Sequence, residues 1–120
     1  MIEFSKYEGA GNDFVVVDAR DWQNPLAVDV VQEICDRHRG IGADGILALW
    51  PHSTDGFEMK VQNADGSDAG MCGNGMRCIL RFLYDLGAVP SEKNTLDLVV
   101  SGESYACEKV DESTFLVVMG

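Results

Sequence analysis

A segment that is apolar on almost every side constrains the fold of this chain most strongly. It covers residues 76–86, and its polar or partly polar members are Arg77, Arg81, Tyr84 and Asp85. At helical spacing these four side chains form one narrow stripe, and Gly87 follows as the expected helix end. A helix with so little polar surface is largely surrounded by protein, so we expect a curved sheet to pack around it.

The rest of the chain shows mainly strand patterns. Alternation over residues 2–8 and a β-branched run over residues 14–18 predict a hairpin joined by a glycine turn. Further strands are predicted at residues 46–50, 56–62, 96–100, 103–110 and 114–119. Asn24 and Pro25 predict the start of an amphipathic surface helix that Gly40 ends. The pattern and the length predict a single α+β domain over residues 1–120.

Composition and charge argue against several classes of partner. The chain has 20 acidic and 9 basic residues, and the basic ones form no stripe that would neutralise phosphates, so no nucleic-acid partner is expected. No apolar run approaches a membrane span and the start of the chain lacks a secretory signal, so we expect a cytoplasmic protein with no membrane partner. Its four cysteines form no CxxC pair and are expected to be free thiols.

Two motifs resemble ligand sites without having their context. GIGADG at residues 40–45 has the spacing of a dinucleotide-binding loop, but it follows a predicted helix and opens a strand, the reverse of that fingerprint. We expect a tight glycine turn there. Cys35 and His38 are the one pair with zinc-like spacing, and the polar loop at residues 63–74 lacks the glycine and the glutamate of a calcium loop. No metal site is predicted.

Cys72 stands where a glycine-rich stretch meets the start of the apolar helix. The free N–H groups and the dipole of a helix start favour a thiolate and can hold a carboxylate, which suits removal of a proton next to a carboxylate. Nucleophilic thiol chemistry and a purely structural thiol are the alternatives. The other three cysteines, Cys35, Cys78 and Cys107, are predicted to be buried. For Asn63, at a strand end, the pattern favours a turn role over a ligand contact.

Three segments occur in order: KYEGAGNDFVVVD, DRHRGIGADGIL and NADGSDAGMCGNGMRC. Together they resemble the N-terminal half of the diaminopimelate epimerase family of bacterial lysine biosynthesis, over nearly the whole chain. Asn74 in MCGNG distinguishes the chain from proline-type racemases, which typically have histidine there. The resemblance implies a mainly antiparallel, barrel-like sheet around a central helix. It also implies interconversion of LL- and meso-diaminopimelate by two cysteines, without pyridoxal phosphate, a metal or another cofactor.

Carried over residue by residue, the resemblance makes Cys72 one of the two catalytic thiols. It makes Gly73 and Asn74 binders of the substrate's α-carboxylate, and Asn12 and Asn63 polar contacts to the amino-acid substrate. The implied substrate role of Asn63 thus replaces the turn role that its residue type favours.

Two departures from the family pattern qualify this resemblance. Many members have glutamine where this chain has Gly45, so any contact from that side chain is absent. The family's chain is also longer and has a second, similar domain. We therefore expect this chain to be the N-terminal domain, to lack the C-terminal domain with the second cysteine, and to be nearly inactive alone.

Three further expectations follow from the missing domain. A second copy of the chain could replace it, so we expect a homodimer more readily than catalysis. A related racemase or isomerase with another substrate is an alternative function, because selectivity for the distal group lies largely outside this chain. A non-catalytic binding module of the same fold is the other alternative.

Overall fold

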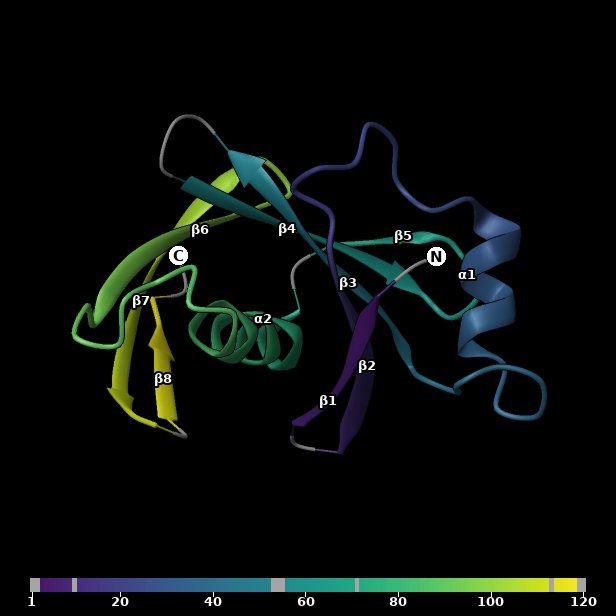
Figure 1. The fold of residues 1–120 in the computed structure, drawn as a ribbon, viewed down its shortest axis with the longest axis horizontal. Coiled ribbons are helices and arrows are strands. Elements are labelled where there is room, and N and C mark those ends of the chain that lie inside the picture. The colour runs from purple at the N-terminus through teal and green to yellow at the C-terminus, as the bar shows by residue number, and fades with distance from the viewer. Residues whose placement is uncertain (1–2, 10, 53–55, 71, 113, 119–120) are drawn as a thin grey trace.

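The computed structural model describes residues 3–9, 11–52, 56–70, 72–112 and 114–118. Its main feature is one curved sheet that curls around a central helix, α2 (Gly73–Asp85), as Figure 1 shows. A second helix, α1 (Val28–Cys35), packs on the other face of this sheet. The strands are β1 (Phe4–Gly9), β2 (Asn12–Asp18), β3 (Gly45–His52), β4 (Gly56–Asn63), β5 (Asp68–Ala69), β6 (Thr95–Val100), β7 (Glu103–Asp111) and β8 (Thr114–Val117).

The strand order makes the sheet an open half-barrel. The order is β1-β2-β3-β4-β6-β7-β8, with the short β5 paired to β4. β2 with β3 and β4 with β6 are parallel, and the other described pairs are antiparallel. This confirms the expected α+β architecture with a mainly antiparallel, barrel-like sheet. The sequence did not predict β5, and the predicted strand positions 2 and 119 lie outside the described residues.

β2 is buried on both of its faces, which explains its unbroken apolar run. Phe14 and Val16 belong to the core around α2, whereas Val15 and Val17 belong to a second core beneath α1. β3 divides its residues in the same way. A strand covered on both faces loses the alternation of a half-exposed strand and becomes continuously apolar. The two cores therefore share β2 and β3 as a common layer.

α2 begins at Gly73, three residues before the predicted start, with Cys72 as its N-cap. Glycine has low helix propensity, and this is why the sequence pattern placed the start later. Gly75 nevertheless packs closely on the sheet, because a Cβ atom there would lie 3.0 Å from Cδ2 of Leu47 on β3, and that side chain would have to shift slightly. The buried residues of α2 are Gly75, Met76, Cys78, Ile79, Leu80, Phe82 and Leu83.

The polar stripe of α2 faces the opening between β1 and β8. On one side the Tyr7 hydroxyl of β1 donates a hydrogen bond to the Asp85 carboxylate. On the other side Tyr84 stacks on Phe115 of β8, with ring centroids 5.9 Å apart. Gly87 has a φ of +74° and its N–H donates to the Tyr84 carbonyl, which confirms it as the helix end.

The prediction that Asn24 caps α1 is wrong. The helix begins at Val28, its N-cap is Ala27 with an extended backbone and no side-chain cap, and Asn24 is exposed. The segment before the helix is held against the sheet instead, because the Gln62 side-chain amide donates to the Leu26 carbonyl at 3.4 Å.

The end of α1 also differs from the prediction. The helix ends at Cys35 rather than just before Gly40. The Asp36 carboxylate accepts hydrogen bonds from the backbone N–H groups of His38 and Arg39, at 2.8 and 3.1 Å, and this local turn replaces the next helical turn. No helix among the described residues has the length and apolar character that a membrane crossing requires.

We predict that Leu83→Ala lowers the free energy of unfolding by about 2–5 kcal/mol, because Leu83 is fully enclosed in the core and its truncation leaves a cavity. Urea unfolding followed by circular dichroism measures this change. Arg77→Ala, on the exposed stripe of the same helix, should change stability by less than about 0.5 kcal/mol. Equal losses in the two variants would contradict the enclosed position of α2.

Candidate functional site

The first turn of α2 places the thiol of Cys72. The Cys72 sulfur accepts a hydrogen bond from the Gly75 N–H at 3.3 Å, and the Cys72 carbonyl accepts one from the Met76 N–H at 2.9 Å. The Cys72 side chain is half-buried. The N–H groups of Gly73 and Asn74 donate to no other described residue. They are the helix-start donors that remain for an anion.

The other three cysteines are buried, as predicted. Cys35 lies beneath α1, Cys78 in α2 and Cys107 in β7, and each is a free thiol less than 5% exposed. Burial raises the pKa of Cys35 and of Cys78, and it raises the pKa of Cys107 to about 11. Cys72 is thus the least enclosed of the four thiols.

Two of the predicted asparagines meet at the start of α2. Asn74 donates from its side-chain nitrogen to Oδ1 of Asn12, the first residue of β2, at 2.9 Å. Asn12 in turn donates from Nδ2 to Oδ2 of Asp44 at 3.3 Å. These contacts join the helix that carries Cys72 to the edge of the sheet.

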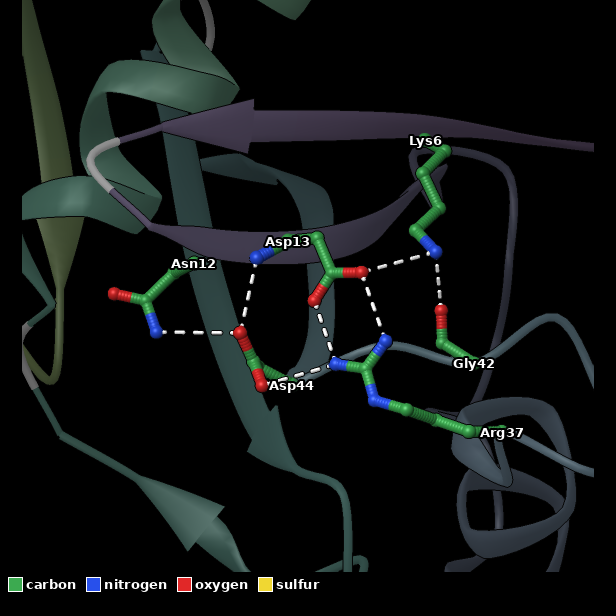
Figure 2. Close-up of polar contacts among 6 residues, drawn as sticks. All are labelled: Lys6, Asn12, Asp13, Arg37, Gly42 and Asp44. Carbon is green, nitrogen blue, oxygen red and sulfur yellow. Dashed lines mark hydrogen bonds and ion pairs between the residues drawn. The ribbon is translucent and has the colours of Figure 1, made fainter.

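A network of charged residues lies beside Asn12, as Figure 2 shows. Arg37 donates two hydrogen bonds to the Asp13 carboxylate, at 2.8 and 3.1 Å, and one to Oδ1 of Asp44 at 3.1 Å. Lys6 lies 3.0 Å from Oδ2 of Asp13 and also donates to the Gly42 carbonyl. The network therefore ties β1, β2 and the segment between α1 and β3 to one another.

Sequence patterns alone do not identify four residues of the site, which are Lys6, Asp13, Arg37 and Asp44. All four lie within the quoted motif segments, so a signal was present in the sequence. Their spacing along the chain does not predict that they lie close together, because the parallel pairing of β2 with β3 brings Asp13 and Asp44 to the same edge of the sheet. The Asp44 N–H donates to the Asp13 carbonyl at 2.9 Å at this junction.

Asn63 has the turn role that its residue type favours. It ends β4, and its side-chain amide donates to the Ser67 hydroxyl at 3.1 Å while its backbone N–H donates to the Ser67 carbonyl at 2.8 Å. Asn63 pairs in register with Gly45, so it lies at the same edge of the sheet as Asp44. A Cβ atom on Gly45 would lie 2.6 Å from the Gln62 carbonyl oxygen, so a larger residue here requires the backbone to shift.

A large cavity in the described part of the chain lies away from Cys72. This cavity, of about 1050 Å³, is lined by residues of β6, β7 and β8 and of the segment after α2, and it includes neither Cys72 nor the three asparagines. Over the described ranges, no three His, Cys, Asp or Glu residues gather as metal ligands would. The groups available for chemistry around Cys72 are its thiol and the neighbouring backbone and amide donors.

The family model and the curated relatives that match this chain indicate one family. A family model described as "Diaminopimelate epimerase" matches residues 4–120. The "Diaminopimelate epimerase" of Prochlorococcus marinus (strain MIT 9313) is 54% identical over 93 residues, covering 72% of this chain and 30% of that protein. The protein of the same name from Alkaliphilus metalliredigens (strain QYMF) is 40% identical over 126 residues, covering 99% of this chain and 43% of that protein. The chain thus spans less than half the length of these relatives.

Solved structures with the same fold are more distant in sequence. A methylitaconate-delta-isomerase has a TM-score of 0.71 at 14% identity, covering 95% of this chain and 62% of its own. A probable proline racemase from Agrobacterium radiobacter K84 has a TM-score of 0.67 at 12% identity, covering 89% and 37%. At these identities the likeness concerns the fold alone.

The charged network makes stability depend on pH in a defined direction. Hydrogen bonds from Arg37 and Lys6 hold the pKa of Asp13 well below its usual range. A carboxyl group with a lowered folded-state pKa contributes stability that is present above its unfolded pKa, about 4, and is lost as pH falls below it.

We therefore predict that Asp13→Asn lowers the free energy of unfolding by about 1–2 kcal/mol at pH 7 and flattens its decline between about pH 5 and pH 2. Urea titrations across this pH range measure both effects. Asp68→Asn, which removes an exposed carboxylate outside the network, should keep the wild-type pH dependence. The same decline in all three proteins would show that the network does not act in this way.

Proposed function

Because the chain belongs to the diaminopimelate epimerase family, we propose that it supplies one half of an active site that inverts the α-carbon of an amino acid. The proposed reaction is the interconversion of LL- and meso-diaminopimelate in lysine biosynthesis. The observation that carries this proposal is the position of Cys72, a half-buried thiol at the start of α2, beside the backbone N–H groups of Gly73 and Asn74.

The proposed step is a proton transfer between two thiols and the α-carbon. Cys72, as a thiolate, takes the α-proton from one face, and the electron pair of the broken C–H bond moves toward the carboxylate. A second thiol then gives a proton to the opposite face and becomes a thiolate, so atoms and charge balance. This chemistry needs neither pyridoxal phosphate nor a metal, and we propose that the enzyme uses none.

The negative charge that develops on the substrate carboxylate needs donors that are already in place. The N–H groups of Gly73 and Asn74 at the positive end of α2 are suited to this task. The side chains of Asn12 and Asn74 supply further polar contacts to the substrate. The Asn63 amide uses one N–H for Ser67, so its oxygen and its second N–H are the groups proposed to contact substrate.

We propose that residues 1–120 correspond to the N-terminal domain of the family and that a second domain supplies the other thiol. Two observations support this. Cys35, Cys78 and Cys107 are enclosed in the two cores, where they cannot reach a substrate held by α2. The chain also spans 30% and 43% of the two relatives described above. Contacts to the distal end of the substrate are proposed to come from that second domain as well.

A related epimerase or isomerase with another substrate is the second candidate function. The donors proposed here contact the α-carboxylate, a group common to all α-amino acids, so they do not select diaminopimelate. A binding module of the same fold, in which Cys72 only caps the helix, is the third candidate, and its thiol would be dispensable.

We also propose a cytoplasmic location and no nucleic-acid partner. Four described cysteines that are all free thiols are typical of a reducing compartment. The net charge of −11 disfavours binding to polyphosphate surfaces.

We predict that a chimera joining residues 1–120 to the remainder of the Alkaliphilus metalliredigens relative epimerises LL-diaminopimelate. Cys72→Ser in this chimera should lower kcat by about 10²–10⁴-fold or more, because it removes the proton-transferring thiol. Incorporation of solvent deuterium at the α-carbon, followed by NMR, measures the rate. Cys78→Ala, in the same helix but buried, is the matched control and should stay active.

Two outcomes of this experiment would count against parts of the proposal. Full activity of the Cys72→Ser chimera would exclude the catalytic role of that thiol. Inversion by the isolated 120-residue chain at the rate of the chimera would exclude the need for a second domain.

A second copy of the chain is a further proposed partner, because β1 and β8 end the described sheet and carry exposed apolar side chains, among them Phe4 and Leu116. A symmetric dimer would bring two Cys72 thiols across one cleft, without the distal contacts that an asymmetric substrate needs.

We predict that the chain sediments as a dimer at micromolar concentration. Its two copies should be cross-linked through Cys72, and this cross-link should be lost in Cys72→Ser. A monomer at all concentrations would contradict this.

A further inference from the structure

The Asn12 side-chain amide lies between Asp44 and Asn74, and it fits there in one orientation only. An ionised carboxylate accepts hydrogen bonds and cannot donate them. Oδ2 of Asp44 must therefore face the nitrogen of Asn12, at 3.3 Å, and this turns Oδ1 of Asn12 toward Asn74. Asn74 meets that oxygen with its own nitrogen, at 2.9 Å. The carboxylate thus determines the orientation of both amides.

Three contacts fix Asp44 in addition to its hydrogen bond from Asn12. Figure 2 shows the two of them that the carboxylate oxygens accept. Arg37 donates to Oδ1 at 3.1 Å, and the Asp13 N–H donates to Oδ2 at 3.0 Å. The Asp44 N–H donates to the Asp13 carbonyl at 2.9 Å, which holds its backbone at the edge of the sheet. Arg37 is held in turn by two hydrogen bonds to the Asp13 carboxylate. The carboxylate therefore has little freedom to turn.

We propose that Asp44, held by Arg37, is a positioning residue that acts through Asn12 on Asn74. Because the nitrogen of Asn74 is turned to Asn12, the Asn74 side-chain oxygen lies at the opposite end of the amide and is available as an acceptor. This places an acceptor in the first turn of α2, beside the backbone N–H donors of Gly73 and Asn74. A ligand with a carboxylate and an adjacent ammonium group matches this pairing, whereas a hydroxy or keto acid offers the acceptor no cation.

The inference rests on the proposed function for the identity of the ligand but not for the orientation of the amides. It predicts one set of Asn74 side-chain amide signals in the ¹⁵N–¹H spectrum of the 120-residue chain. Asp44→Asn keeps the size of the side chain but allows either orientation, so a second set of signals or exchange broadening should appear at Asn74. Asp44→Ala removes the acceptor and should shift the Asn74 signals outright.

Asp18→Asn is the matched control. It removes one carboxylate from the far end of β2, where Asp18 holds Arg20 through two hydrogen bonds, so the change in net charge is the same. The Asn74 signals of this variant should coincide with those of the wild type. If Asp44→Ala does not fold, the isosteric Asp44→Asn decides the question. Asn74 signals in Asp44→Asn that coincide with those of the control would overturn the inference.

In the chimera, Asp44→Asn and Asp18→Asn distinguish a positioning effect on substrate binding from a general loss of stability. We expect Asp44→Asn to raise KM for diaminopimelate about tenfold with kcat little changed, which corresponds to one hydrogen bond to a charged group. Asp18→Asn should leave both constants unchanged. A fall in kcat alone, or equal effects of the two substitutions, would overturn the assignment. An inactive chimera would count against the proposed function, whereas the amide spectra would still decide the orientation.

Discussion

The enclosure of α2 by the curved sheet is the constraint on which the rest of the structure depends. Leu80 and Leu83 are fully buried, and burying side chains of this size contributes roughly 1.5–3 kcal/mol each before entropy is counted. A helix held on so many sides cannot slide or rotate without exposing such side chains. The position of Cys72 is therefore determined by the core, since Cys72 is the N-cap of that helix.

Apolar packing and polar contacts have separate tasks in this chain. Packing sets where α2 starts, and polar contacts then align the groups around that start. The starts of β2 and β3 and the end of β4 meet at one edge of the sheet because β2 and β3 are parallel and β4 runs antiparallel to β3. Asn12 is the first residue of β2, Asp44 directly precedes β3, and Asn63 is the last residue of β4. Three segments that are distant in the sequence thus contribute polar groups to one small area.

Much of this fold was predictable from local patterns, whereas the polar site was only partly so. The apolar helix, the hairpin and the main strands follow from periodicity, and Cys72 follows from the glycines that precede the helix. The Asn24 cap failed because a good capping residue does not start a helix when the chain around it is bonded to the sheet. The contacts among Asp13, Arg37 and Asp44 could not be predicted, because they depend on which strands pair in parallel.

The two-faced burial of β2 has a consequence for how the chain finds its native pairing. A strand with one apolar face cannot slip by one residue, because its apolar side chains would then face water. In β2 a one-residue slip would only exchange Phe14 and Val16 for Val15 and Val17 between the two cores. Burial of apolar side chains alone thus favours the native alignment of β2 only weakly over the alignment shifted by one residue. The slip would, however, move Asp13 away from Arg37 and Lys6, so these charged contacts favour the native alignment over the shifted one.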